Sequence, residues 1–240
     1  MIESSTSGLL DWLYPPSCVL CKTPTRRGQN ICHPCRNQLP RPPASSCLRC
    51  AQAFDGNMEP PSTCPNCIDL NPQFSFAISA LRDHSDTISL IHHLKLLRHP
   101  ELATDLAQIA AEAFQREPRL SEIVDPILIP IPLHGSRLRE RGFNQAEAIA
   151  RPLSSKLGLD CDLALKRIRA TPRQATLSRK ERRKNLAKAF QLRTDSEKIA
   201  GRNLILIDDV FTTGSTVNEC ARALQGAKPA QISVFTIMRA

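Results

Sequence analysis

Residues 204–216 read Leu-Ile-Leu-Ile-Asp-Asp-Val-Phe-Thr-Thr-Gly-Ser-Thr, and this stretch predicts an α/β fold. Four consecutive apolar residues are typical of a strand buried on both faces, as in a parallel sheet. Two carboxylates, Asp208 and Asp209, follow at its carboxyl end, and a hydroxyl-rich turn with one glycine comes next. Residues 217–227 then have a helical pattern. Because ligands of α/β sheets bind beyond the carboxyl ends of the strands, this order predicts a binding site at the turn.

The chemistry of this site indicates a phosphorylated sugar. Turn amides and a helix N-terminus attract a monophosphate. Carboxylates accept hydrogen bonds from the vicinal hydroxyls of a ribose. The alternative interpretation is an ordinary strand–turn–helix connection with two adjacent acids. The chain has no Gly-x-x-x-x-Gly-Lys-Ser/Thr and no Gly-x-Gly-x-x-Gly, so neither a P-loop nor a dinucleotide fingerprint is indicated.

A second loop with phosphate-binding character follows an earlier β-rich run at residues 127–131. It reads Pro-Leu-His-Gly-Ser-Arg-Leu-Arg-Glu-Arg-Gly-Phe-Asn-Gln over residues 132–145 and carries Arg137, Arg139 and Arg141. Backbone amides combined with guanidinium groups suit a diphosphate. A solvated charged turn is the alternative. The position of this loop directly after a predicted strand favours a phosphate-binding site.

Eight of the ten cysteines form four Cys-x-x-Cys pairs. They are the predicted metal ligands: Cys18, Cys21, Cys32, Cys35, Cys47, Cys50, Cys64 and Cys67. Ten residues separate the first two pairs and thirteen the last two, and two such pairs can close a tetrahedral zinc site. We expect one or two structural Zn²⁺ sites paired in sequence order. An interleaved pairing stays open, and a disulfide framework conflicts with the absence of an export signal.

Positive charge is concentrated in one segment. The chain has a formal net charge of +9. Residues 166–184 contain nine basic side chains and one acidic one, so this segment alone carries +8. It has no stable apolar stripe. This distribution indicates a polyanionic partner such as pyrophosphate or nucleic acid.

The chain divides by composition into two parts. Residues 1–70 are rich in cysteine and proline and form the predicted double zinc-ribbon module. Residues 71–240 alternate predicted strands (74–81, 127–131, 204–207, 232–237 and, weakly, 159–165) with predicted helices (90–97, 102–113, 146–157, 217–227), which indicates an α/β domain with a parallel sheet covered on both faces. No apolar run approaches the roughly 18 residues of a membrane span, and residues 1–14 have no basic region of a signal peptide, so a cytoplasmic location is expected.

The stretch at 204–216 resembles the phosphoribosyl-pyrophosphate (PRPP) loop of type I phosphoribosyltransferases. The pattern at 130–145, together with the paired cysteines, resembles the ComF/GntX branch of that family over essentially the whole chain. The resemblance implies the type I phosphoribosyltransferase fold, with Mg²⁺ accompanying PRPP. It implies that Asp208 and Asp209 hold the ribose hydroxyls as catalytic residues. It also implies that the turn wraps the 5-phosphate with Thr212, Thr213, Gly214, Ser215 and Thr216.

The cationic segments supply the candidates for the pyrophosphate: Arg137, Arg141, Arg179, Lys180, Arg182 and Arg183. The family places a flexible catalytic loop near residues 167–186, and a nucleic-acid tether is the alternative role for this segment. Two departures from the family also stand out. Lys95 is followed by Leu96, where relatives often have a Lys-Tyr pair, and no segment resembles an acceptor-binding hood.

The family's role implies a PRPP-binding protein that acts in competence-related DNA uptake or DNA utilisation. The alternative is a catalytically inactive factor that handles single-stranded DNA, with PRPP as a regulatory or vestigial ligand. Competence proteins are the implied protein partners. The acceptor and the oligomeric state are not indicated by the sequence.

Overall fold

The computed structural model describes residues 15–43, 45–54, 64–170, 186–193 and 196–240. Its centre is a sheet of five strands in the order β1-β7-β6-β2-β3. All four pairings in it are parallel. The strands are β1 (Ala77–Arg82), β2 (Ile127–Pro130), β3 (Asp160–Cys161), β6 (Asn203–Phe211) and β7 (Gln231–Arg239). The central strand β6 is buried along nearly its whole length, which explains its continuous apolar run.

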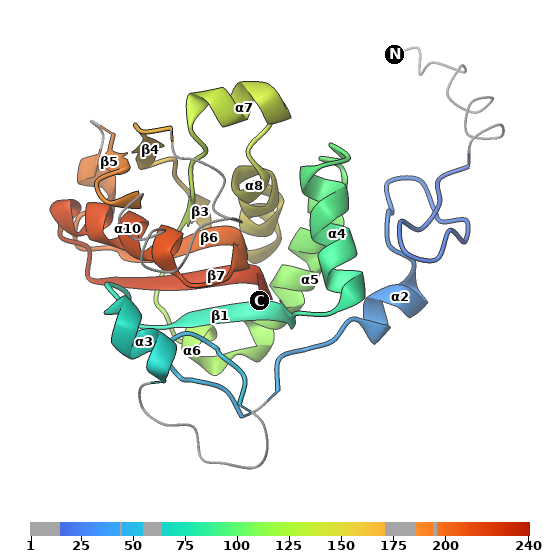
Figure 1. The fold of residues 1–240 in the computed structure, drawn as a ribbon, viewed down its shortest axis with the longest axis horizontal. Helices are drawn as coiled ribbons and strands as arrows, with labels where there is room; N and C mark the ends of the chain where they lie inside the picture. The colour runs from blue at the N-terminus through green and yellow to red at the C-terminus, as the bar shows by residue number, and fades with distance from the viewer. Residues whose placement is uncertain (1–14, 44, 55–63, 171–185, 194–195) are drawn as a thin grey trace.

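Helices and a hairpin cover the two faces of the sheet (Figure 1). One face packs against α4 (Ser85–Lys95), α5 (Leu102–Arg116) and α8 (Gln145–Leu157). The other face packs against α10 (Ser215–Leu224) and an antiparallel hairpin of β4 (Leu165–Arg167) and β5 (Phe190–Leu192). The short elements are α2 (His33–Gln38), α3 (Pro65–Leu70), α6 (Pro118–Ser121), α7 (Gly135–Arg141), η2 (Ser196–Ile199) and η3 (Gln225–Ala227).

The two cysteine-rich segments attach to opposite faces of the sheet. The first segment places Ile31 and Leu39 in the hydrophobic core of the α5 face. Its Asn30 donates main-chain and side-chain hydrogen bonds of 3.1 and 2.9 Å to Asp105 Oδ2 in α5. The second segment places its four cysteines and Leu70 in the core of the α10 face. The second segment therefore shares a core with the turn that follows β6.

The predicted parallel sheet with flanking helices is confirmed, with three local differences. Strand β6 continues through the acidic pair to Phe211, so the carboxylates lie within the strand rather than after it. The run at 159–165 splits between the two-residue strand β3 and the start of β4, which belongs to a different sheet. The β4–β5 hairpin was not predicted, because neither of its three-residue strands is long enough to show a period.

The charged turn at 137–141 is in fact the helix α7. The side chain of His134 caps it by accepting a 3.3 Å hydrogen bond from the Ser136 amide. Gly142 ends it with a φ of +88°, a left-handed conformation that favours glycine. None of its residues is buried, so the apolar spacing that reveals most helices is absent here.

No helix in the described parts of the chain has the length and apolar character needed to cross a membrane.

Candidate functional site

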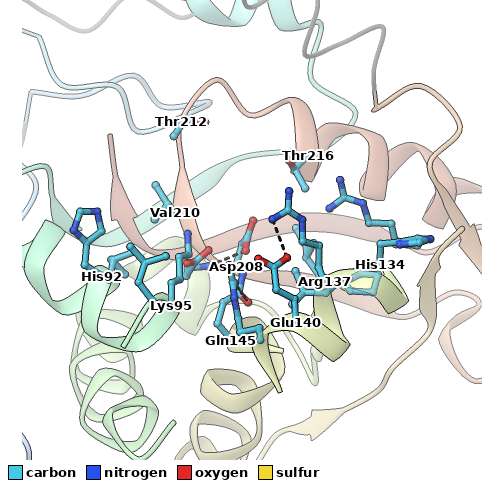
Figure 2. A pocket seen from close by; sticks show the side chains of 18 of the residues that line it. His92, Lys95, His134, Arg137, Glu140, Gln145, Asp208, Val210, Thr212 and Thr216 are labelled. Atoms are coloured by element: carbon cyan, nitrogen blue, oxygen red, sulfur yellow. Dashed lines mark hydrogen bonds and ion pairs between the residues drawn. The ribbon is translucent and has the colours of Figure 1, made fainter. Parts of the chain in front are cut away.

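A cavity of about 710 Å³ opens beyond the carboxyl ends of β2, β6 and β7 (Figure 2). Helix α4 forms one wall and α7 the opposite wall, with the end of β6 between them. The polar residues that line it are His92, Lys95, Arg98, His134, Ser136, Arg137, Glu140, Arg141, Gln145, Arg167, Asp208, Asp209, Thr212 and Thr216. The position is the one expected for a ligand site in a parallel α/β sheet.

The acidic pair lies at the centre of this cavity. Asp208 is 9% exposed and Asp209 is 2% exposed. The main-chain amide of Asp209 donates a 2.9 Å hydrogen bond to Asp208 Oδ1, which fixes the first carboxylate. Burial raises the pKa of Asp208 to about 6, against the opposing effects of the nearby cations Lys95, Arg167 and Arg141. Asp208 therefore has oxygens that can accept hydrogen bonds from a ligand and a charge that is sensitive to its surroundings.

Lys95 is a site residue that sequence reasoning missed. It is the last residue of α4 and forms an ion pair with Asp209 (Figure 2). Burial lowers the pKa of Lys95 to about 8, although the charge of Asp208 acts in the opposite direction. In the sequence, Lys95 stands out only because Leu96 follows it where relatives often have tyrosine. A pattern that could have identified Lys95 is its position directly after Leu94, the last residue of the buried apolar stripe of α4.

Helix α7 places two of the predicted pyrophosphate ligands at the cavity. Arg137 Nη1 lies 3.3 Å from Glu140 Oε2, and Arg141 Nη1 donates a 2.5 Å hydrogen bond to Gln145 Oε1. Arg139 of the same helix does not line the cavity. The β4–β5 hairpin adds Arg167, which lies in the basic segment recognised from the sequence. The candidates Arg179, Lys180, Arg182 and Arg183 lie outside the described residues.

The hydroxyl-rich turn connects β6 to α10. Thr212 and Thr216 line the cavity, whereas Thr213, Gly214 and Ser215 form the body of the turn. The hydroxyls of Thr213 and Ser215 lie 2.9 Å apart. Gly214 has a φ of +79° and is the N-cap residue of α10. The turn thus presents hydroxyls and the start of a ten-residue helix to one edge of the cavity.

The eight paired cysteines form two separate clusters. Their members are Cys18, Cys21, Cys32 and Cys35 in one, and Cys47, Cys50, Cys64 and Cys67 in the other. In each cluster the four sulfurs lie within 4.8 Å of one another. Four thiolates at about 2.3 Å from zinc are about 3.8 Å apart, so both clusters fit a tetrahedral zinc ion.

The pairing in sequence order is therefore correct, and the interleaved pairing is wrong. Measured contacts agree with this geometry: Cys21 and Cys32 Sγ are 3.5 Å apart, and Cys47 and Cys67 Sγ are 3.9 Å apart. Structural Zn²⁺ is the metal that such four-thiolate knuckles hold.

Comparison with known families covers both parts of the chain. The double zinc ribbon domain matches residues 9–68, and the phosphoribosyl transferase domain matches residues 94–240. Among solved structures, the glutamine PRPP amidotransferase of Bacillus subtilis aligns with 61% of this chain and 30% of its own, at 13% identity and a TM-score of 0.41, which is too distant to inform the site.

Three curated relatives are similar in sequence. The DNA utilization protein YhgH of Escherichia coli O157:H7 is 33% identical over 94% of this chain and 97% of its own length. Competence protein F of Haemophilus influenzae is 29% identical over 93% of this chain and 96% of its own length. Competence protein ComFC of Bacillus subtilis is 36% identical over 47% of this chain and 44% of its own length. The chain belongs to the ComF family, in which a double zinc ribbon precedes a phosphoribosyltransferase domain.

Proposed function

We propose that the cavity between α4 and α7 binds PRPP together with Mg²⁺. The observation that carries this proposal is the pair of buried carboxylates, Asp208 and Asp209, at the end of β6, between a hydroxyl-rich helix start and a basic helix. A ligand that fits this order must carry vicinal hydroxyls in its middle and phosphate groups at both ends. PRPP has that arrangement.

Each part of the site has a role in this proposal. The carboxylates of Asp208 and Asp209 accept hydrogen bonds from the two ribose hydroxyls. The hydroxyls of Thr212 and Thr216 and the start of α10 bind the 5-phosphate. The guanidinium groups of Arg137 and Arg141 bind the pyrophosphate, together with cations of the segment 179–183. Lys95 holds Asp209 in place before the ligand arrives.

The arrangement also suits transfer of the ribose 5-phosphate group to an acceptor. Displacement of pyrophosphate at C1 develops positive charge in the ribose ring, and the nearby carboxylates stabilise that charge. The arginines of α7 stabilise the charge that develops on the leaving pyrophosphate. Mg²⁺ bound together with PRPP would supply positive charge that assists the departure of the pyrophosphate.

Calorimetric titration of the zinc-loaded protein with PRPP and Mg²⁺ tests the binding proposal. We expect saturable binding that weakens at least about 100-fold in the double variant Asp208→Asn/Asp209→Asn, since each lost charge-assisted hydrogen bond contributes about 1.5–3 kcal/mol. The matched control is Asp160→Asn/Asp162→Asn, a second pair of nearby carboxylates outside the cavity. Equal affinity in the two double variants would contradict the proposal.

A separate assay addresses transfer. Release of pyrophosphate from PRPP is measured with nucleobases, amines and single-stranded DNA offered in turn. Release that depends on one of these acceptors assigns the enzyme class, and binding without release from any of them supports a regulatory role for PRPP.

The relatives favour a biological role in DNA uptake or DNA utilisation, because two of the three are named as competence proteins and the third as a DNA utilization protein. We propose that this chain acts in the same process and contacts single-stranded DNA through its basic segment at 166–184. Few aromatic side chains are present in the chain, so this contact is mainly electrostatic.

Fluorescence anisotropy with a labelled oligonucleotide tests the DNA proposal. We expect affinity to fall by more than about 10-fold between 50 and 200 mM salt, because several phosphate contacts release counterions. The variant Arg179→Gln/Arg182→Gln/Arg183→Gln should flatten this dependence, whereas Arg222→Gln on the exposed side of α10 should not. Affinity that does not respond to salt would refute an electrostatic contact.

A further inference from the structure

Arg239, at the carboxyl end of β7, joins the second cysteine cluster to the hydroxyl-rich turn. The side chain is buried, at 6% exposure. Its Nε donates a 3.1 Å hydrogen bond to the main-chain carbonyl of Cys50, and its Nη2 donates a 2.5 Å hydrogen bond to Gln52 Oε1. Its Nη1 donates to the carbonyls of Phe211 and Thr212 at 3.0 and 2.8 Å. One guanidinium group thus spans the metal knuckle and the first residues of the turn.

The guanidinium also packs against the aromatic ring that supports the turn. The carbon Cζ of Arg239 lies 4.9 Å from the centroid of the Phe211 ring. Phe211 is 1% exposed and makes an edge-on contact with Phe74 at 6.2 Å between centroids. The position of this ring is therefore set by both the sheet and the arginine.

A second set of contacts connects the same cluster to the turn and to α10. The Asn218 side chain, in the first turn of α10, donates a 3.1 Å hydrogen bond to the carbonyl of Leu70, three residues after Cys67. It also accepts a 2.7 Å hydrogen bond from the Gln73 amide. Leu70 packs so closely on Gly214 that a Cβ at this glycine would lie 2.7 Å from Leu70 Cδ2. The second zinc ribbon therefore forms part of the wall behind the turn.

The first cluster has no comparable connection among the described residues. Its segment contacts α5 through Asn30 and Asp105, on the opposite face of the sheet. Its cysteines range from buried to exposed, whereas all four of the second cluster are buried. The two zinc ribbons are thus unequal in their relation to the site.

We infer that the second zinc ribbon is a structural part of the phosphate-binding turn, and that Arg239 is the positioning residue that couples occupancy of this metal site to ligand affinity. The inference rests on the proposed binding of the 5-phosphate at the turn. Zinc fixes the Cys47–Cys50 knuckle, whose carbonyl at Cys50 orients the guanidinium. The guanidinium in turn holds the carbonyls of Phe211 and Thr212, and this fixes the direction of the main-chain amides in the turn that follows.

An arginine is required for this role because it donates in three directions from one rigid plane. A lysine at the same position keeps the charge but cannot hold the Cys50, Gln52 and Phe211–Thr212 acceptors at once. Because binding couplings are reciprocal, a ligand at the turn must raise the zinc affinity of the second cluster by the same factor by which zinc raises the ligand affinity.

The test compares Arg239→Lys with Arg222→Lys, a control of the same chemistry on the exposed side of α10. Ribose 5-phosphate is the probe, since it reaches the turn and the carboxylates without a pyrophosphate group. We expect its dissociation constant to rise at least about 10-fold in Arg239→Lys and to stay unchanged in Arg222→Lys. Zinc content, measured with a colorimetric indicator, is expected to remain at two per chain in both. Hydrogen exchange of amides 212–218, without ligand, should accelerate only in Arg239→Lys.

Chelator competition supplies the reciprocal measurement. Saturating ribose 5-phosphate should tighten only one of the two zinc equivalents, and Arg239→Lys should abolish that response. If Arg239→Lys has the same amide hydrogen exchange and the same affinity for ribose 5-phosphate as the wild-type protein, the inference is refuted and the proposed function is unaffected. If the wild-type protein binds neither PRPP nor ribose 5-phosphate, both the proposed function and the coupling of zinc to ligand affinity are refuted. The exchange of residues 212–218 then still decides whether Arg239 positions the turn.

Discussion

Replacing Asp208 by asparagine should change how the stability of the protein depends on pH. Burial raises the pKa of this carboxyl from 3.8 to about 6 in the folded protein. Between these two values the folded state retains a proton that the unfolded state has lost. The free energy of unfolding therefore falls as pH rises through this window, and it levels off above pH 6. Asparagine has a similar shape and no proton to lose, so Asp208→Asn should not show this fall.

The size of the effect follows from the shift. A difference of about two pKa units corresponds to about 3 kcal/mol between the acidic and neutral limits. Roughly two-thirds of this change, about 2 kcal/mol, falls between pH 4.5 and 7. The variant should therefore gain about 2 kcal/mol relative to the wild-type protein over that range. Its Oδ1 can still accept the hydrogen bond from the Asp209 amide, so this contact is not lost.

Urea unfolding of both proteins at a series of pH values measures the difference directly, because effects common to both, such as protonation of the zinc ligands, cancel. The control is Asp160→Asn at an exposed position in β3, where a surface substitution should change stability by less than about 0.5 kcal/mol. If the difference in the free energy of unfolding between wild type and Asp208→Asn stays constant from pH 4.5 to 7, the assignment of a buried, destabilised carboxylate to this site is refuted.

Three further perturbations have expected outcomes. Gly214→Ala places a Cβ 2.6 Å from Phe211 Cζ at a φ of +79°, and should lower the free energy of unfolding in urea by about 2–5 kcal/mol. The control Gly201→Ala has a φ of +68° and open space around its Cβ, so it should lower this free energy by only about 1–2 kcal/mol. Equal losses of stability in the two variants would argue against close packing at the turn. Lys95→Met leaves the buried Asp209 carboxylate without its ion-pair partner and should lower stability by about 1–3 kcal/mol, the cost of an unsatisfied buried acceptor. Lys156→Met, on the exposed surface of α8, should have little effect, and an equally small effect of Lys95→Met would show that the ion pair does not contribute to stability. A chelator should remove one zinc quickly and the other slowly, because only the second cluster is wholly buried, and release in a single phase would contradict this order.

Sequence patterns indicated the parallel α/β sheet, the zinc ribbons and the hydroxyl-rich turn that connects β6 to a helix. These features are local. A buried parallel strand has a continuous apolar run, a metal knuckle has a fixed Cys-x-x-Cys spacing, and a phosphate-binding turn has glycine and hydroxyls directly before a helix. Pairing of the cysteines in sequence order was the expected arrangement, with an interleaved pairing left open, and the two clusters confirm the sequence order.

Other features depended on residues that meet only in the folded chain. Lys95 reaches Asp209 from 114 positions earlier in the chain, and Arg239 reaches Cys50 across 189 positions. No sequence pattern can reveal these two contacts, because the number of residues between the partners depends on the order of the strands in the sheet. Helix α7 escaped detection because it buries no residue.

The sequence therefore determined which chemical groups the protein has and which of them lie together in one turn or one knuckle. Only in the folded chain does α4 bring a lysine to the acidic pair, and only there does the second zinc ribbon, not the first, pack behind the hydroxyl-rich turn. This is because the strand order β1-β7-β6-β2-β3 places distant segments side by side, and burial then strengthens the few polar contacts between them.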